Sequence, residues 1–456
     1  MNLWILTEER PKKEVIELII RKLAEDNKLK VNFEKVKIRP IIKNKKFSFT
    51  YKVVGVNLES IDDILIKIVS GESSFVDFLI FLQENEPDAN SLPLYAIEET
   101  KTADVESRNT GVYQRCSKFV YCEFYYPQCK KIMLYNIKVK SKKKPSETNI
   151  FGTRMLMTLG VEVLGKTLDN NTFKKFNSID ELIDFKNHMK RPPSGNVPIL
   201  IKKVDECIEI SGRLYKAGGL SHDPNIGALT IIAATLRKLG WNKDIIITQH
   251  GLSQQHVNER NKFVKIANKI NIKLKGLTLP QSSLPTEYWY YEKESEKIVT
   301  IFLHLLLEEM VDVEVIYENH AGCERGYFKI PSGEFVTIHK YIENDKSKGI
   351  VSLPDLIVCD HKRKQILCIE GKKYENVEEG ITELKDFDPI EKEYIKKYYP
   401  GYNVTRHVVL FGSYSSILTR PEVAFLLNSN GEMILSKNTP EVIKDAIEEL
   451  LSVANS

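Results

Sequence analysis

The sequence predicts an α/β fold with mixed sheets, and two observations carry this prediction. Along the 456 residues, short apolar runs rich in β-branched side chains alternate with segments whose apolar residues recur at helical spacing. In addition, one pattern of strand, turn and strand occurs near residues 77–101 and again near residues 355–373. A unit that occurs twice shapes the architecture of the whole chain.

The N-terminal segment begins with a helix, expected over residues 12–26, because its apolar residues recur every three or four positions. Alternating β-type residues predict strands at 47–56, and residues 61–69 are expected to form a short helix. A strand led by Asp77 follows, then the turn ENEPDANS, and then a second strand that ends in Glu99-Thr100-Lys101. We therefore expect a hairpin that brings Asp77 near Glu99 and Lys101.

Two neighbouring acids complicate the assignment in this first hairpin. Asp88 follows a proline, but it lies in the turn, so Pro87-Asp88 is interpreted as turn chemistry and Asp77 is preferred. Glu98 precedes Glu99 and is expected on the opposite face of the strand, exposed to solvent.

The segment after this hairpin is basic and aromatic, with Arg108, Arg115 and Lys118 between aromatic residues. A helix that faces phosphate and a plain amphipathic helix both explain it. The basic, polar run at 138–149 ends the strand pattern, so we place a boundary there, either a solvated linker or a loop that faces DNA.

Residues 150–290 are expected to form a middle domain with its own helices and strands. Its glycine-rich segment AGGLSHDPNIG, at 217–227, precedes an apolar helix, and the amide groups at a helix start can hold a phosphate. The side chains that could read base edges here are His222, Asn225, Gln249 and Gln254. A simple connection from strand to helix explains the same residues, so both interpretations stay open.

The second hairpin, at 352–373, carries the most informative residues of the chain. Asp355 leads its first strand, LIVCD, and Glu370 and Lys372 close its second strand, QILCIEGK. Glu370 and Lys372 are two positions apart, so they project from one face, and the paired strand can bring Asp355 to the same place. Two carboxylates so close together favour a divalent cation between them, and magnesium prefers carboxylate and water oxygens. An ordinary buried hairpin with charged surface residues is the alternative.

The surroundings of the two hairpins are alike. A helix at 292–310 and a strand at 313–317 precede the second hairpin, and Glu308 or Glu309 of that helix is a candidate for a further metal ligand. A helix over 377–398 and a strand at 407–411 follow it. Tyr-Tyr-Pro ends the helix after each hairpin, at 125–127 and at 398–400, and a strand comes next each time. The chain then turns at Asn430-Gly431 and ends in an amphipathic helix.

These residues resemble the PD-(D/E)xK nuclease superfamily, the fold of most type II restriction endonucleases. The resemblance implies that Asp355 and Glu370 bind Mg²⁺ and that Lys372 orients or helps to deprotonate the attacking water. It implies the same roles in the first hairpin for Asp77, Glu99 and Lys101, with Asp77 and Glu99 as the metal ligands. The first hairpin departs from the family motif, because Val76 stands where the motif has proline.

The predicted architecture is a mixed-sheet PD-(D/E)xK restriction-endonuclease-like core that is present twice, with a middle α/β domain. The expected domains are an N-terminal nuclease-like module at 1–140, a middle domain at 150–290 with a role in DNA recognition, and a C-terminal nuclease module at 291–456.

Composition agrees with a globular protein of two or three domains, since 42% of the residues are hydrophobic. A formal net charge of +4 permits DNA binding through local basic clusters without demanding it. The seven cysteines include no C-x-x-C pair, so free thiols in a reducing compartment are expected. We see no apolar run of transmembrane length and no signal-peptide pattern, and we expect a cytoplasmic protein without membrane contact.

The expected function is therefore that of a type II restriction endonuclease, which hydrolyses sequence-specific double-stranded DNA with Mg²⁺. With one site per strand a single chain could cut both strands, as a monomer or a homodimer, and a cognate DNA methyltransferase would be its partner in a restriction–modification system. Two alternatives stay open: a structure-specific nuclease of DNA repair or recombination, and a non-catalytic DNA-binding protein with relic nuclease modules.

Overall fold

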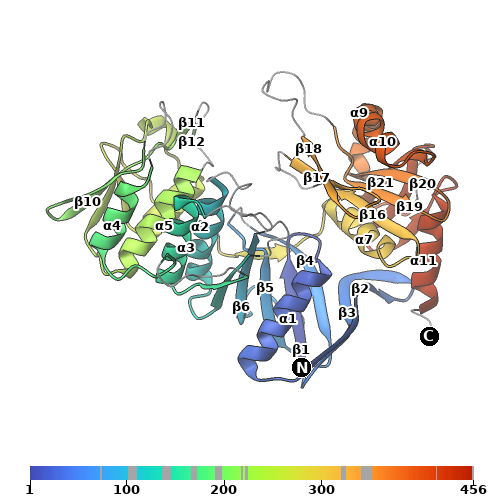
Figure 1. Ribbon diagram of the computed structural model, residues 1–456, viewed down its shortest axis with the longest axis horizontal. Coiled ribbons are helices and arrows are strands. Elements are labelled where there is room, and N and C mark those ends of the chain that lie inside the picture. Colours follow the sequence, from blue (N-terminus) through green and yellow to red (C-terminus); the bar gives the residue numbers. More distant parts are fainter. Residues whose placement is uncertain are drawn as a thin grey trace. The chain divides into compact units, whose positions relative to one another are not determined.

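The chain folds into two compact units (Figure 1). The computed structural model describes residues 1–71, 74–100, 110–135, 145–165, 172–190, 198–216, 219–220, 224–319, 325–339, 352–416 and 419–453. Unit 1 contains residues 1–3, 9–69 and 291–456, and unit 2 contains residues 4–8 and 70–290. Both units combine helices with mixed sheets, so the α/β class predicted from the sequence is confirmed.

This division does not follow the three expected domains, 1–140, 150–290 and 291–456. Residues 9–69 belong with the C-terminal segment, and the described residues of 70–140 belong with the middle segment. The boundary near residue 290 is common to both divisions. Within the described residues, no helix is long and apolar enough to cross a membrane.

Unit 1 contains a six-stranded sheet in the order β16-β19-β20-β21-β22-β23 and a two-stranded hairpin of β17 and β18. It also contains the N-terminal strands β2, β3 and β4. Their bounds are β2 (Val31–Lys43), β3 (Lys46–Leu58), β4 (Ile64–Gly71), β16 (Val313–Glu318), β17 (Arg325–Lys329), β18 (Phe335–His339), β19 (Leu356–Asp360), β20 (Gln365–Lys373), β21 (Asn403–Gly412), β22 (Val423–Asn428) and β23 (Met433–Leu435). In the six-stranded sheet, β19 runs antiparallel to β16 and to β20, whereas β21 is parallel to both β20 and β22.

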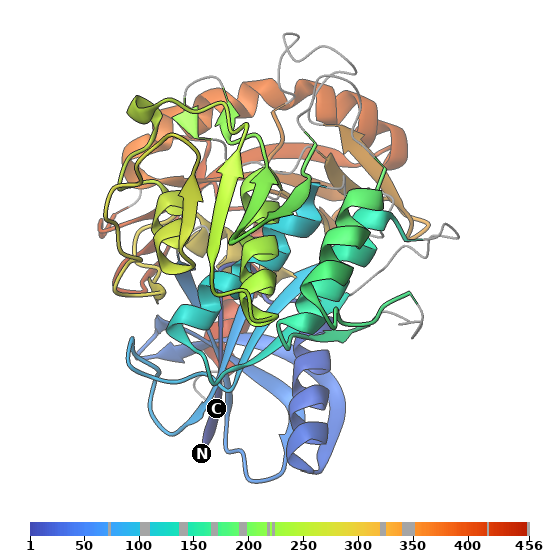
Figure 2. The same cartoon turned by 90° about the vertical axis from the view of Figure 1, so that its left-hand side faces the viewer.

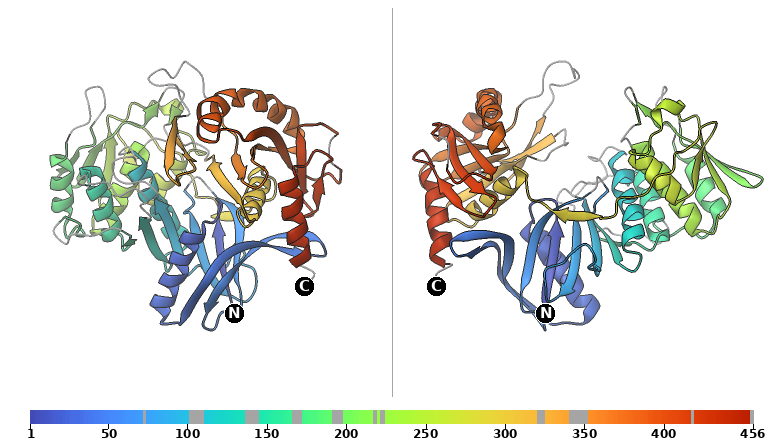
Figure 3. Two further views of the ribbon diagram at one scale, coloured as in Figure 1. Left: turned by 45° about the vertical axis from the view of Figure 1, so that its right-hand side comes forward. Right: turned by 180° about the vertical axis from the view of Figure 1, so that it is seen from behind.

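Helices lie on both faces of this six-stranded sheet. Their bounds, with that of the N-terminal helix of the unit, are α1 (Lys13–Asn27), α7 (Lys297–Leu307), α8 (Val377–Glu383), α9 (Asp388–Ile390), α10 (Lys396–Tyr398) and α11 (Glu441–Val453). Gly371 of β20 faces Thr300 of α7, whereas its neighbour Lys372 reaches Glu383 of α8. Because successive residues of a strand point to opposite faces, α7 and α8 cover opposite faces of the sheet. Figure 3 shows α11 beside the strands of this sheet, and α11 packs against α7.

The segment expected as one helix over 377–398 is interrupted. Helices α8, α9 and α10 are separated by a 3₁₀ turn at Leu384–Phe387 and a π-helical turn at Glu391–Ile395. Pro389 lies in the first turn of α9, where its missing N–H ends the hydrogen-bond ladder of the preceding turn. The expected helix at 61–69 is wrong, because residues 64–71 form β4, whose first three residues and residues 68–70 are buried. Its β-branched residues suit a strand that is buried on both faces.

The N-terminal strands belong to the same core as the C-terminal segment. The ring of Phe47, in β3, lies with its centroid 5.0 Å from that of Phe302 in α7. The Phe47 N–H donates to the carbonyl of Gly431 at 2.8 Å, in the turn between β22 and β23. Phe302 in turn stacks on Phe425 of β22, at 6.1 Å between centroids. This aromatic contact joins sequence segments more than 250 residues apart in one core.

Unit 2 contains the first hairpin and the whole middle segment. Its strands are β1 (Asn2–Thr7), β5 (Phe78–Gln83), β6 (Tyr95–Thr100), β7 (Lys130–Tyr135), β8 (Glu162–Leu164), β9 (Ile201–Val204), β10 (Cys207–Ser211), β11 (Tyr215–Lys216), β12 (Gly219–Leu220), β13 (Asp244–Thr248), β14 (Ile272–Leu274) and β15 (Trp289–Tyr291), of which β1 and β15 each extend to residues of unit 1. Its helices are α2 (Thr110–Tyr125), α3 (Glu147–Thr158), α4 (Ile179–His188), α5 (Pro224–Lys238) and α6 (Lys262–Lys269).

Two sheets organise unit 2. In the first, β5 is antiparallel to β6, while β7 is parallel to both β6 and β8. This repeats the directions of β19, β20, β21 and β22 in unit 1, so the two hairpins predicted to be alike have the same pairing pattern. The second sheet has the order β14-β13-β10-β9, and its green and yellow strands are seen in Figure 2.

Helices α2 and α5 cross at very short range. A Cβ atom at Gly227 of α5 would lie 2.8 Å from the carbonyl carbon and oxygen of Tyr113 in α2. Only a residue without a side chain allows this approach, so the last glycine of the segment 217–227 has a packing role. The crossing fixes α2 on the middle segment, and α2 also carries Lys118.

Candidate active sites

The C-terminal hairpin brings together Asp355, Glu370 and Lys372, as expected. Leu356 pairs with Ile369, so Asp355, one residue earlier, lies opposite Glu370. The N–H of Gly371 donates to Asp355 Oδ2 at 2.9 Å. The main chain at Asp355 is anchored as well, because its carbonyl accepts from Asn319 N at 2.8 Å, just after β16. The backbone therefore holds the Asp355 carboxylate against the strand that carries the other two residues.

Lys372 bridges two acids from different elements. Its Nζ lies 3.0 Å from Glu370 Oε1 and 2.8 Å from Glu383 Oε2 at the end of α8. Glu383 was missed at the level of sequence. A sequence signal for Glu383 exists, because it lies on the apolar-periodic helix that follows the hairpin. This helix connects the parallel strands β20 and β21, and Glu383 lies on its face towards Lys372.

The acid near Asp355 at helix α7 differs from the expected one. Glu296, the residue before α7, is close enough to Asp355 to affect its ionisation. Glu308 and Glu309, which we considered as further metal ligands, instead pair with basic residues of the N-terminal segment. Lys13 Nζ lies 3.1 Å from Glu308 Oε1, and Lys37 Nζ lies 2.8 Å from Glu309 Oε2. The acids at the C-terminal end of α7 thus join the N-terminal segment to the rest of unit 1. The N-terminal end of α7 lies near the site.

The two carboxyl groups of this site are costly to ionise together. Burial raises the pKa of Asp355, and the charges of Glu296 and Glu383 act in the same direction, against the Gly371 N–H and Lys372. Burial raises the pKa of Glu370 too, and the charge of Asp355 adds to it. Glu370 Oε2 is buried and has no hydrogen-bond partner among the described residues. A positive charge beside these two groups would relieve both penalties.

The carboxylates of this site suit magnesium by their chemistry, but a set of three protein ligands is missing among the described residues. Magnesium is usually held by one or two carboxylates and keeps several waters, which matches Asp355 and Glu370 with the open oxygen of Glu370. Within the parts of the chain that the structure describes, no group of three or more His, Cys, Asp or Glu side chains is arranged to hold a metal ion. The protein ligands would therefore be the two carboxylates, and the other positions would be taken by water and phosphate oxygens.

The N-terminal hairpin has the same backbone geometry with a register that differs from the expected one. Phe78 pairs with Ile97, so Asp77, one residue earlier, lies opposite Glu98. The N–H of Glu99 donates to Asp77 Oδ2 at 2.7 Å, as the N–H of Gly371 does to Asp355. Glu98 therefore stands where Glu370 stands, and Glu99 corresponds to Gly371. Our expectation of a solvent-exposed Glu98 is wrong, because only 1% of Glu98 is exposed.

The lysine of the N-terminal site comes from a helix. Thr100 occupies the strand position of Lys372, and Lys101 lies outside the described residues. Lys118 of α2 contacts both acids, with its Nζ 2.8 Å from Glu98 Oε2 and 3.5 Å from Asp77 Oδ1. Arg115, one turn earlier, donates to Thr100 Oγ1 at 2.9 Å.

The electrostatics of this N-terminal site parallel those of the C-terminal one. Burial raises the pKa of Glu98 to about 8, together with the charge of Asp77 and against that of Lys118. Burial disfavours the charge on Lys118, but Glu98 and Asp77 outweigh it and raise the lysine pKa. The described residues thus hold two acid–acid–lysine clusters, one in each unit.

Other expected residues lie apart from both clusters. Asp88 accepts hydrogen bonds from Asn90 N at 2.9 Å and Ser91 Oγ at 3.2 Å, as predicted for turn chemistry. In the middle segment, His222 lies outside the described residues. Asn225 donates to the carbonyl of Arg213 at 3.0 Å, and both ends of the Gln254 amide bond the main chain of Thr278, at 2.8 and 3.0 Å. Asn225 and Gln254 thus have structural partners here.

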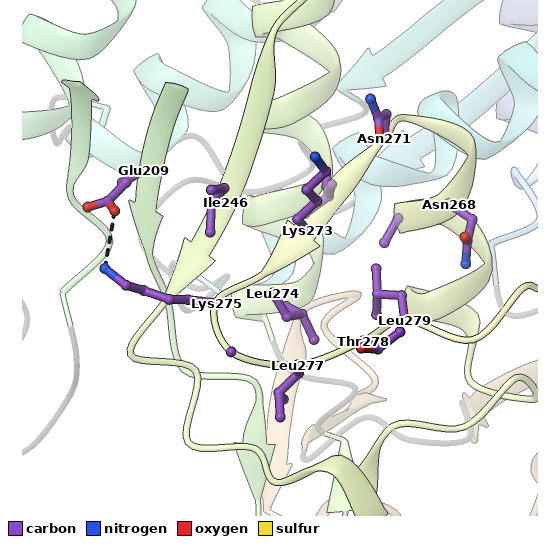
Figure 4. A pocket seen from close by; sticks show the side chains of 13 residues that line it. Glu209, Ile246, Asn268, Asn271, Lys273, Leu274, Lys275, Leu277, Thr278 and Leu279 are labelled. Atoms are coloured by element: carbon purple, nitrogen blue, oxygen red, sulfur yellow. Dashed lines mark hydrogen bonds and ion pairs between the residues drawn. The ribbon is translucent and has the colours of Figure 1, made fainter. Parts of the chain in front are cut away.

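A pocket opens in the middle segment at β13, β14 and the loop that follows (Figure 4). Lys273 and Lys275 line it, and Lys275 pairs with Glu209 across it at 3.3 Å. None of the residues that line the pocket belongs to either acid–acid–lysine cluster. No family model, curated protein or solved structure matches this chain.

Proposed function

We propose that this protein is a magnesium-dependent DNA endonuclease of the type II restriction class, built on a PD-(D/E)xK core that occurs twice. One observation carries the proposal: in a hairpin whose second strand is parallel to the strand after α8–α10, Asp355 lies opposite Glu370 and Lys372 contacts Glu370. The unpartnered oxygen of buried Glu370 supports a cation at the same place. The restriction class and the DNA substrate rest on the motif resemblance.

In this proposal the residues of the chain hold and orient the reactants. Asp355 and Glu370 would bind Mg²⁺, which when bound makes a water more acidic and neutralises charge on the phosphate. Lys372 would donate a hydrogen bond to the attacking water, in a position fixed by Glu370 and Glu383. The water oxygen forms a bond to phosphorus, the P–O3′ bond breaks, and the released oxygen takes a proton. The products are a 3′-hydroxyl and a 5′-phosphate.

Cleavage of supercoiled plasmids and of a large viral genome with Mg²⁺ tests this function. The expected result is discrete linear fragments from the wild type and a loss of at least about 100-fold in the rate at which Lys372→Ala and Glu370→Gln form linear fragments. Lys385→Ala is the control, because Lys385 is an exposed lysine just after α8, the helix that carries Glu383. Preference for branched over duplex DNA would replace the restriction class by a repair class. Binding of DNA with no Mg²⁺-dependent product would refute the enzyme.

A further inference from the structure

The two acids of the N-terminal hairpin repeat the geometry of the two acids in the C-terminal site. In each hairpin an aspartate leads the first strand and accepts a main-chain N–H from the second strand, at 2.7 Å in one and 2.9 Å in the other. In each, a buried glutamate lies directly opposite that aspartate, namely Glu98 and Glu370, which are 1% and 5% exposed. The third group, a lysine, contacts the glutamate at 2.8 Å and at 3.0 Å.

The lysines reach these glutamates from different elements. Lys372 comes from the strand itself and is held in turn by Glu383 of the following helix. Lys118 comes from the following helix, α2, and the strand position of Lys372 is taken by Thr100, which accepts from Arg115 of the same helix. The lysine thus comes from the strand in the C-terminal site and from the following helix in the N-terminal site, and in both it contacts the buried glutamate.

We propose that Asp77, Glu98 and Lys118 form a second metal-binding and catalytic site of the nuclease, which replaces the set Asp77, Glu99 and Lys101 suggested by the sequence. Asp77 and Glu98 bind a divalent cation, and Lys118 positions the water for the same hydrolysis as at the C-terminal site. This inference rests on the proposed nuclease function, and it assigns one site to each strand of the duplex.

A purely structural ion pair is the competing explanation for Lys118. In that case the pair only ties α2 to the sheet, and its removal affects stability without a strand-specific loss. The two explanations therefore differ in whether cleavage of one strand is lost selectively when the residues are changed.

The test uses a plasmid that the wild-type chain linearises. Glu98→Gln and Lys118→Met should slow the cut of one strand at least about 100-fold, so that nicked circles accumulate. Lys372→Ala should also give nicked circles, and run-off sequencing should place its nick on the opposite strand. Lys130→Met, a lysine of the neighbouring strand β7, is the matched control and should linearise the plasmid at the wild-type rate.

Two further variants decide which glutamate and which lysine of the N-terminal module belong to the second site. If Glu99→Gln and Lys101→Ala give nicked circles while Glu98→Gln and Lys118→Met linearise the plasmid normally, the proposed second site is refuted and the sequence assignment is restored. Because Lys118→Met leaves a buried carboxylate without its partner, the double variant Glu98→Gln/Lys118→Met removes both charges, and its thermal unfolding shows that loss of cutting is not loss of folding.

Counting bound Mn²⁺ by electron paramagnetic resonance separates this inference from the proposed function. The wild type should bind two ions, and Glu98→Gln and Glu370→Gln should each bind one. One bound ion, unaffected by Glu98→Gln, would overturn the second site even if the protein cuts DNA. If no DNA is cut, the nuclease function fails, and the ion count still decides whether Asp77 and Glu98 bind a metal.

Discussion

Gly371 shows how one residue between the two functional side chains shapes the C-terminal site. It separates Glu370 from Lys372, donates its N–H to Asp355, and faces α7. A Cβ atom here would lie 2.4 Å from Thr300 Cγ2 and 3.2 Å from Asp355 Oδ2. The absence of a side chain lets α7 approach β20 closely enough to bring Glu296 near Asp355.

Gly371→Ala is expected to destabilise unit 1 by about 1–3 kcal/mol, because the added methyl group overpacks the contact with Thr300. Adding Thr300→Ser removes the Cγ2 atom and keeps the hydroxyl that bonds the Lys297 carbonyl at 3.1 Å. The double variant should therefore recover most of the lost stability in chemical denaturation, whereas Thr300→Ser alone should change it little. Equal instability of the single and double variants would show that the methyl group clashes elsewhere.

At the scale of elements, the position of α2 determines whether the N-terminal site has a lysine. Lys118 reaches the acids only because α2 lies over β5 and β6, and the crossing with α5 at Gly227 sets that position. The corresponding helix after the C-terminal hairpin, α8, contributes a glutamate instead. Helix α2 thus completes the N-terminal site, whose acids Asp77 and Glu98 come from the hairpin of β5 and β6.

Gly227→Ala should lower the stability of unit 2. In a free helix this change would stabilise by about 1 kcal/mol, but the new Cβ would meet the main chain of Tyr113 at 2.8 Å, which cannot rotate away. We expect a net loss of about 1–3 kcal/mol, seen as a lower midpoint of thermal unfolding. Lys238→Ala, at an exposed position of the same helix, should change stability by no more than about 0.5 kcal/mol. A rise of the midpoint for Gly227→Ala would contradict the close crossing.

At the scale of the molecule, unit 1 is assembled from both ends of the chain. Phe47 is 2% exposed and lies against Phe302, and the N-terminal lysines pair with the acids at the end of α7. Residues 9–69 therefore contribute to the core that supports the C-terminal site, although a hairpin, a helix and the whole middle segment separate them from it in sequence.

Phe47→Ala should destabilise unit 1 by about 3–5 kcal/mol, as expected for a truncated core phenylalanine. Hydrogen exchange measured by mass spectrometry should become faster in β3, α7, β22 and β23, and should stay unchanged in α5, β13 and β14. Phe263→Ala, which truncates a phenylalanine of α6 that is 1% exposed, should give the reverse pattern. Faster exchange in β5 and β6 with an unchanged C-terminal segment would favour the division at residues 140 and 290 instead.

The sequence by itself determined several local elements of this protein and the residues of the C-terminal cluster. Hydrophobic period and turn residues located α1, both hairpins and the Asn430-Gly431 turn, since these signals act over a few residues. Asp355, Glu370 and Lys372 were found because the two strands are joined by a short charged turn that fixes their register. The interruption of the helix at 377–398 was missed, although Pro389 signals it.

Only the tertiary structure decided the N-terminal cluster and the composition of the two units. Positions 98 and 99 both hold glutamate, and a shift of one residue in strand pairing moves a side chain to the other face, so a period of two cannot choose between them. Lys118 and Glu383 come from helices, and Phe47 comes from a segment more than 240 residues from the sheet that it supports. Their positions depend on packing between segments distant in sequence, which a local pattern does not encode.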